Sequence, residues 1–412
     1  MESPKLRIAG LEPWQRTLYI MFIAQFMAAV GFSSIFPFLP FYVEELGTNT
    51  SLSITFLAGL VYSAQAFTMM ISAPIWGTLA DRLGRKMMVE RAMFGGAVLL
   101  LLMGFARSAE EVVLLRAIQG LVTGTVAAAN ALVAAEAPRK HTGYAMGLLQ
   151  VGFGAGLAIG PLLGGAISDA IGYSAAFYIT AAMLFLAGVL VWLGIHEDFV
   201  AQEKTAGTRW GFKSRWVGIF KTEGVPVAFG MRFLGSLGRM MIIPIIPLFI
   251  QVLLVDSERL NTFTGLMMGV ASAATMLSAI YFGRLGDKIG HRKVLIGCSL
   301  VAGVLYVPQT WVSTAWGLLI FLVLVGVAIG GVIPTVSALL AGYTRHGEEG
   351  AVYGLDNSIN AGGRAIAPLL GAWIATGLGL RITFLAAGII FMVSALVAAW
   401  MMPKTVAVQR II

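Results

Sequence analysis

Five ionisable side chains stand inside long apolar stretches of this 412-residue chain, namely Arg116, Arg232, Arg239, Asp356 and Arg364. An ionisable group at membrane depth costs free energy, so by default it indicates a functional site. Asp356 is the only acid clearly inside such a stretch and is therefore the leading candidate for carrying a proton. Burial favours its protonated form, whereas a nearby arginine favours its ionised form. The alternative is a structural acid near a helix end, paired with Arg232 or Arg364. Glu136, at the end of another stretch, is a second candidate.

Other kinds of reactive site are missing from the sequence. All four histidines lie in or beside polar loops, which argues against a histidine proton relay. The sequence has no Asp-x-x-Asp-Asp pattern, no cluster of histidine and cysteine, and no phosphate-binding loop. It therefore argues against a membrane-embedded enzyme, a cofactor or metal, and an ATP-driven pump. Any transport must draw on a gradient.

The elements that carry these side chains are apolar helices. The chain is 58% hydrophobic and 12% charged, whereas a soluble domain carries about 25% charged residues. About 20 apolar residues suffice to span a bilayer. We predict an all-α membrane protein whose twelve transmembrane helices form two pseudo-symmetric bundles of six. The predicted segments are 15–43, 54–79, 87–106, 110–135, 142–168, 173–195, 222–253, 262–283, 293–311, 314–341, 349–376 and 380–402.

The basic residues predict the orientation. Lys and Arg concentrate in loops that share one side of the membrane, and the positive-inside rule makes that side cytoplasmic. Both termini are then cytoplasmic, in a multi-pass protein of the inner membrane. The net charge of +8 fits anionic lipid as a partner better than nucleic acid, because the cations sit beside apolar helices.

Several landmarks occur twice. The charged loop 77–86 returns at 283–293, and Asp81 and Asp287 lie 206 positions apart. Gly160-Pro161-Leu162-Leu163-Gly164 returns 207 positions later as Ala367-Pro368-Leu369-Leu370-Gly371. Such a repeat is typical of a duplicated transporter. We predict bundles at 1–196 and 222–412, joined by a cytoplasmic linker at 197–221 that either lies on the membrane surface or is loosely solvated.

The chain resembles the major facilitator superfamily over nearly its whole length. Gly77 to Lys86 is similar to that family's signature between helices 2 and 3, and Leu115 to Gly120 to its helix-4 signature. Gly152 to Gly165 is similar to the helix-5 signature typical of drug:proton antiporters. The resemblance implies two bundles that rock about a central cavity, a monomer that suffices for transport, and a proton-coupling role for Arg116. Several multidrug antiporters carry an acid in helix 1, but this chain has Gln25 there.

The two charged loops are candidate conformational latches. In the duplicated fold, Asp81 would face the amino end of helix 11 and Asp287 that of helix 5, where the helix dipole favours a carboxylate. These contacts would form only when the cytoplasmic side is closed. The alternative is a pair of tight turns that merely obey the positive-inside rule. The predicted latch residues are Gly77, Asp81, Arg82, Gly84, Arg85, Gly283, Asp287, Gly290 and Arg292.

The glycines of segment 142–168 form a second predicted site. Small residues at a spacing of four let two helix backbones touch in lipid. We expect this stripe to seal against helix 8 and to help block leakage, with Pro161 kinking the helix. The residues are Gly152, Gly156, Gly160, Pro161, Gly164 and Gly165.

The remaining polar groups in the segments predict a substrate cavity. Lipid penalises uncharged polar groups too, so they are expected to face a cavity. The polar and charged candidates are Gln25, Asn130, Gln150, Arg232, Arg239, Asn357, Asn360 and Arg364, and Phe32 is a candidate for an apolar wall of the cavity. We predict a transporter that exports small amphiphilic compounds in exchange for protons. The excess of arginines also fits neutral or anionic substrates and keeps open an organic-anion exchanger or a proton-coupled importer.

Overall fold

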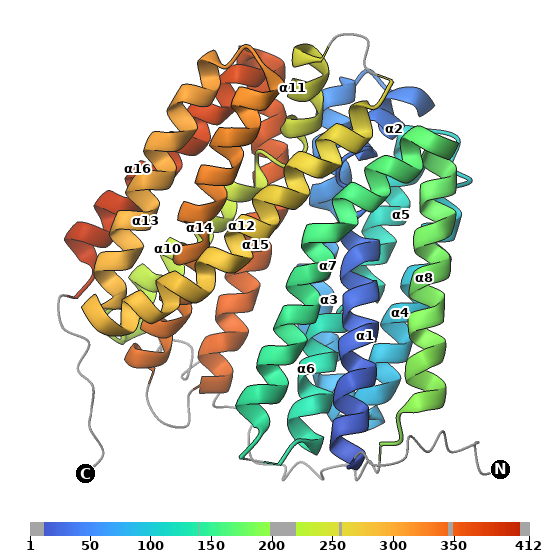
Figure 1. Ribbon diagram of the computed structural model, residues 1–412, viewed down its shortest axis with the longest axis vertical. Coiled ribbons are helices and arrows are strands. Elements are labelled where there is room, and N and C mark those ends of the chain that lie inside the picture. The colour runs from blue at the N-terminus through green and yellow to red at the C-terminus, as the bar shows by residue number, and fades with distance from the viewer. Residues whose placement is uncertain (1–11, 139, 198–219, 255–257, 345–348, 404–412) are drawn as a thin grey trace. The chain divides into compact units, whose positions relative to one another are not determined.

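The computed structural model describes residues 12–138, 140–197, 220–254, 258–344 and 349–403. Every regular element in these ranges is a helix (Figure 1). Most of the predicted linker, residues 198–219, lies outside the described residues.

The six amino-terminal segments correspond to eight helices. Segment 15–43 is divided by a turn before Leu39, and segment 110–135 is divided at Thr123 and Gly124. The helices are α1 (Pro13–Ser33), α2 (Leu39–Leu46), α3 (Ile54–Leu83), α4 (Arg85–Met103), α5 (Ala109–Val122), α6 (Thr125–Glu136), α7 (Thr142–Ile171) and α8 (Tyr173–Gly194).

The carboxyl-terminal segments follow the same plan, with a turn between α10 and α11 where α1 and α2 have theirs. The elements are α10 (Val225–Met240), α11 (Ile245–Leu253), α12 (Leu260–Ile289), α13 (His291–Tyr306), the 3₁₀ helix η1 (Val307–Trp311), α14 (Ala315–Tyr343), α15 (Glu349–Leu378) and α16 (Leu380–Met401).

Within the described residues, nine helical stretches are long and apolar enough to cross a membrane. The other three predicted segments lie on α4, α5 with α6, and α15. They fall short for local reasons: α4 opens on charged residues, the fourth segment is broken, and α15 is rich in polar residues. The all-helical membrane fold is confirmed.

The chain divides into two compact units, described here as unit 1 (1–202 with 255–269) and unit 2 (203–254 with 270–412). In unit 1, α1 lies along α7 and α8, while α3 lies along α5 and α4 along α8 (Figure 1). In unit 2, α13 packs between α14 and α16, and α10 packs on α15 and α16. The first turns of α12 thus group with unit 1, although the predicted boundary placed them in the second bundle.

The break in the fourth segment is stabilised from α3. When a helix ends, its last carbonyl groups lose their partners. Here the Ser72 hydroxyl donates to Gly120 O at 2.9 Å, and the Trp76 indole donates to Leu121 O at 2.5 Å. These carbonyls would have bonded to the amides of residues 124 and 125 in an unbroken helix. Polar side chains of α3 therefore replace the lost backbone bonds.

The two charged loops are built alike. Gly84 and Gly290 each end one helix and begin the next with φ of 97°, a left-handed conformation that favours glycine. The cation that follows binds the end of the last helix in its unit. Lys86 Nζ donates to Trp192 O at 3.0 Å, and Arg292 Nε donates to Met402 O at 3.0 Å. These cations compensate the partial negative charge at the carboxyl ends of α8 and α16.

The predicted glycine stripe of α7 packs mainly against α1. The sequence-based expectation placed this contact instead on the eighth predicted segment, 262–283, which is α12 in the structure. A Cβ at Gly156 would lie 2.7 Å from Phe26 O, and one at Gly160 would lie 2.8 Å from Val30 O. Gly152 and Gly164 likewise face α1. The reason is spacing, because residues four apart along α7 share one face, and α1 occupies that face.

A neighbouring face of α7 contacts the first turns of α12. A Cβ at Gly269 would lie 2.5 Å from Ala158 O, and Gly265 sits against the Pro161 carbonyl group. Gly165 sits against the backbone of Asn261. The eighth predicted segment, α12, therefore meets the fifth, α7, chiefly through its own glycines, and Gly165 is the member of the predicted set that takes part.

Asp169 caps the amino end of α12 across this seam. Its Oδ1 accepts from the Asn261 amide at 3.2 Å and from Asn261 Nδ2 at 2.7 Å. Its Oδ2 accepts from the backbone amide and the hydroxyl of Thr262, each at 2.6 Å. The first amides of a helix lack internal partners and attract negative charge. One carboxylate thus fixes the start of α12.

Candidate functional site

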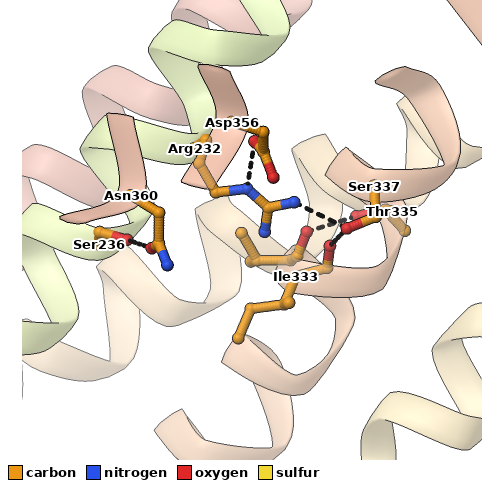
Figure 2. A network of polar contacts seen from close by, with 8 residues as sticks. Arg232, Ser236, Ile333, Thr335, Ser337, Asp356 and Asn360 are labelled. Atoms are coloured by element: carbon orange, nitrogen blue, oxygen red, sulfur yellow. Dashed lines mark hydrogen bonds and ion pairs between the residues drawn. The ribbon is translucent and has the colours of Figure 1, made fainter. Parts of the chain in front are cut away.

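Asp356 and Arg232 form an ion pair inside unit 2 (Figure 2). Arg232 Nε donates to Asp356 Oδ1 at 2.7 Å, and both side chains are only 10% exposed. Arg232 Nη2 also donates to Ser337 Oγ at 2.7 Å, and Ser337 in turn donates to Ile333 O at 3.2 Å. The pair therefore joins α10, α14 and α15. The contact is one of the two arginine pairings, with Arg232 or Arg364, that the sequence offered for Asp356.

A second polar contact runs parallel to the ion pair. Ser236 hydrogen-bonds to Asn360, as Figure 2 shows. Ser236 lies four residues after Arg232, and Asn360 lies four residues after Asp356. Residues four apart share a helix face, so α10 and α15 are joined by two successive polar contacts, Arg232–Asp356 and Ser236–Asn360, which we call the polar ladder. Because these contacts are buried, each side chain needs its partner.

A cavity of about 120 Å³ adjoins the ladder. Its polar side is formed by Arg232, Ser236, Arg239 and Asn360, and its apolar side includes Val332 and Phe391. Three predicted cavity residues, Arg232, Arg239 and Asn360, thus line one cavity.

Arg116 occupies the interior of unit 1. Its side chain is fully buried, and Nη1 donates to Gln65 Oε1 and Gln119 Oε1, both at 3.0 Å. Nε and Nη2 have no hydrogen-bond partner among the described residues. Both hydrogen-bond partners of this arginine among the described residues are therefore neutral amides, and sequence reasoning did not assign Gln65 and Gln119 to it.

The other predicted cavity residues are scattered. Gln25 is buried in α1, and its Oε1 lacks a partner among the described residues. Phe32 packs edge-on against Phe36. Gln150 and Asn357 are exposed at the surface of their units. The remaining positions are Asn130 in α6, Glu136 at the end of α6, and Arg364 in α15.

The latch residues are only partly described. The side chains of Asp81 and Arg82, and the surroundings of Gly77, lie outside the described residues. Asp287 is 74% exposed and lies 3.2 Å from His291 Nε2. The amides of Arg85 and Lys86 donate to the Glu197 carboxylate at 3.0 and 2.8 Å. The latch itself stays a prediction.

Sequence reasoning missed Asp169 and Glu197, the two carboxylates that cap helices from outside. Both stand just beyond an apolar run, where an acid resembles an ordinary loop residue. A partial indication for Asp169 was present in the sequence, because an acid a few residues after the glycine-rich run of segment 142–168 lies near a surface of close helix packing. Its partner helix was not deducible from local sequence.

Comparison with known proteins agrees with this architecture. Residues 21–253 and 228–410 match the model of the Major Facilitator Superfamily. The chain belongs to the major facilitator superfamily. Within it, the chain is 33% identical over 393 residues to the multidrug resistance protein MdtG of Yersinia enterocolitica serotype O:8, covering 95% of this chain and 94% of that protein. MdtG of Serratia proteamaculans is 32% identical and covers 95% of both chains.

Solved structures of the superfamily share the fold at low identity. A mutant of the nucleoside transporter NupG superposes with a TM-score of 0.76 at 14% identity, covering 93% of this chain and 99% of that one. The resemblance to the superfamily's multidrug efflux group is confirmed by the MdtG relatives. The chain is therefore a multi-pass membrane transporter rather than an enzyme.

Proposed function

We propose that the protein exports small amphiphilic compounds in exchange for protons by alternating access, with Asp356 as the proton carrier. The observation that carries the proposal is the buried Arg232–Asp356 pair beside a cavity. A carboxylate that can be protonated at membrane depth couples a charge to the membrane potential. One elementary charge moved across 100 mV contributes about 2.3 kcal/mol.

The MdtG relatives support a multidrug-type substrate range, and the glycine-rich α7 supports the antiport direction. The apolar wall of the cavity suits the hydrophobic part of an amphiphile. Arg116 adds a fixed positive charge in unit 1. We further propose that the protein works as a monomer in the inner membrane with both termini in the cytoplasm.

Everted membrane vesicles test the proposal. Export runs inward in such vesicles, so energised vesicles should accumulate a neutral fluorescent dye such as N-phenyl-1-naphthylamine, and an uncoupler should abolish the accumulation. Asp356→Asn, verified as inserted and folded, should lose it. Glu44→Gln serves as the control, because it neutralises an exposed acid at the end of α2. Full activity in Asp356→Asn would refute the assignment of the carrier.

The second candidate function is an organic-anion exchanger. The arginines at the cavity favour it, since a negative group would compensate their charge. It predicts that an anion exchanges down its own gradient in vesicles without a proton gradient. Accumulation that requires the proton gradient would exclude it.

A further inference from the structure

Two arginines, Arg232 and Arg239, line the cavity of unit 2, and only Arg232 has an acidic partner among the described residues. Arg232 is compensated by Asp356. Arg239, which lines the same cavity, has no hydrogen bond or ion pair to any described residue. A cation at membrane depth is costly unless a partner compensates it.

No ion pair joins Arg239 to an acid of the described residues. Asp356, the acid at the same cavity wall, is already paired with Arg232. A bound anion would supply the compensating charge that Arg239 lacks among the described residues.

The surroundings of Arg239 suit such a group. Arg232, Ser236 and Arg239 lie at positions i, i+4 and i+7 of α10, which share one helix face. Asn360 adds an amide from α15, and its contact with Ser236 holds both side chains at the cavity wall (Figure 2). The guanidinium fork of an arginine can donate two parallel hydrogen bonds to a carboxylate, sulfonate or phosphate group.

The size of the cavity limits what enters. Sites for whole drug-sized ligands measure about 300 to 1,000 Å³, whereas this cavity measures about 120 Å³. It therefore admits a headgroup and a few adjoining carbons. Val332 and Phe391, which also line the cavity, would contact those carbons.

We propose that this cavity binds the anionic headgroup of an amphiphilic substrate, with Arg239 as its main contact. The inference rests on the proposed function in placing the cavity on the substrate path. Arg232 is paired with Asp356 in the structure, so Arg239 is the cation at the cavity that is left for the headgroup, and Ser236 with Asn360 orients it.

Binding to the purified full-length chain tests the inference without transport. The probes are naphthalene-1-sulfonate and naphthalene-1-sulfonamide, which share a ring system and differ in charge. Isothermal titration calorimetry in a neutral detergent and a Tris–chloride buffer, which contains no carboxylate, sulfonate or phosphate, should show tighter binding of the sulfonate. Because a hydrogen bond to a charged group is worth more than a neutral one, Arg239→Gln should weaken sulfonate binding by about 10- to 100-fold and leave the sulfonamide unchanged.

Two further variants make the test specific. Arg239→Lys keeps the charge but loses the fork, so sulfonate affinity should fall between those of wild type and Arg239→Gln. Arg284→Gln removes an exposed arginine of the same unit and should bind like wild type. Equal wild-type affinity for both probes, or unchanged sulfonate binding in Arg239→Gln, would overturn the inference.

The outcome is separable from that of the proposed function. If Arg239→Gln loses sulfonate binding while energised vesicles accumulate no compound, the anion site stands and proton-driven export fails. If vesicles accumulate the neutral dye while Arg239→Gln binds sulfonate normally, export stands and the anion site fails.

Discussion

Replacing either Arg232 or Asp356 alone should lower the free energy of unfolding more than replacing both residues together. The atoms lie 2.7 Å apart and the side chains are 10% exposed, so the attraction acts at a dielectric well below that of water. Unit charges about 4 Å apart attract by about 4 kcal/mol at an effective dielectric of 20. Asp356→Ala leaves Arg232 with Ser337 as its partner among the described residues and should destabilise the fold by about 3 kcal/mol.

A second single variant, Arg232→Met, and the double variant Arg232→Met/Asp356→Ala complete a double-mutant cycle. Arg232→Met should cost about 2 kcal/mol, because it leaves Asp356 buried without its ionic partner while the methionine still fills the space of the arginine stem. The double variant buries no unpaired charge and should cost only about 1 kcal/mol. The coupling free energy between the two residues is then about 4 kcal/mol.

The assay is unfolding of the purified protein by sodium dodecyl sulfate in mixed micelles, followed by tryptophan fluorescence. Ser337→Ala is the uncharged control, because it removes one hydrogen bond and should cost about 1 kcal/mol. A double variant as unstable as the two single variants combined would refute the reasoning, since the pair would then contribute no coupling.

The helix contacts give three further predictions, which the same unfolding assay checks. Asp169→Ala should destabilise the protein by about 2 kcal/mol and Asp169→Asn by less, because the amide keeps one acceptor for Asn261 but loses its acceptor for the Thr262 amide; wild-type stability in Asp169→Asn would contradict a charge-assisted cap. Gly156→Leu should prevent α7 from packing on α1 and cost more than about 3 kcal/mol, whereas stability near that of wild type would disprove a close contact. Gly84→Ala should cost about 1 kcal/mol at its φ of 97°, and no loss would show that the turn relaxes.

Much of the fold was predictable from sequence because a chain inside lipid must satisfy its backbone hydrogen bonds internally. Apolar runs long enough to span a bilayer must become helices, so all twelve segments fall on helices of the structure. The duplicated glycines of the charged loops also predicted two similar turns, at Gly84 and Gly290. These features depend on neighbouring residues only.

Contacts between distant helices were harder to predict. The α7 stripe was correctly identified as a close-packing surface, but spacing alone cannot say which helix covers it, and α1 does so through Phe26 and Val30. The Asp356–Arg232 pair was one of several possible pairings, because the sequence gives no distance between α10 and α15. The cap by Asp169 was missed for the same reason.

The two halves of the duplicated chain have a similar order of helices, but their buried charged residues differ. Arg116 in unit 1 has neutral amide partners, whereas Arg232 in unit 2 has a carboxylate. A neutral partner cannot take up a proton at physiological pH and a carboxylate can. The proposed proton carrier, Asp356, therefore lies in unit 2 with an arginine as its partner. The same unit holds Arg239 beside the ladder, so the proton and the substrate headgroup would bind to neighbouring positions on α10 and α15.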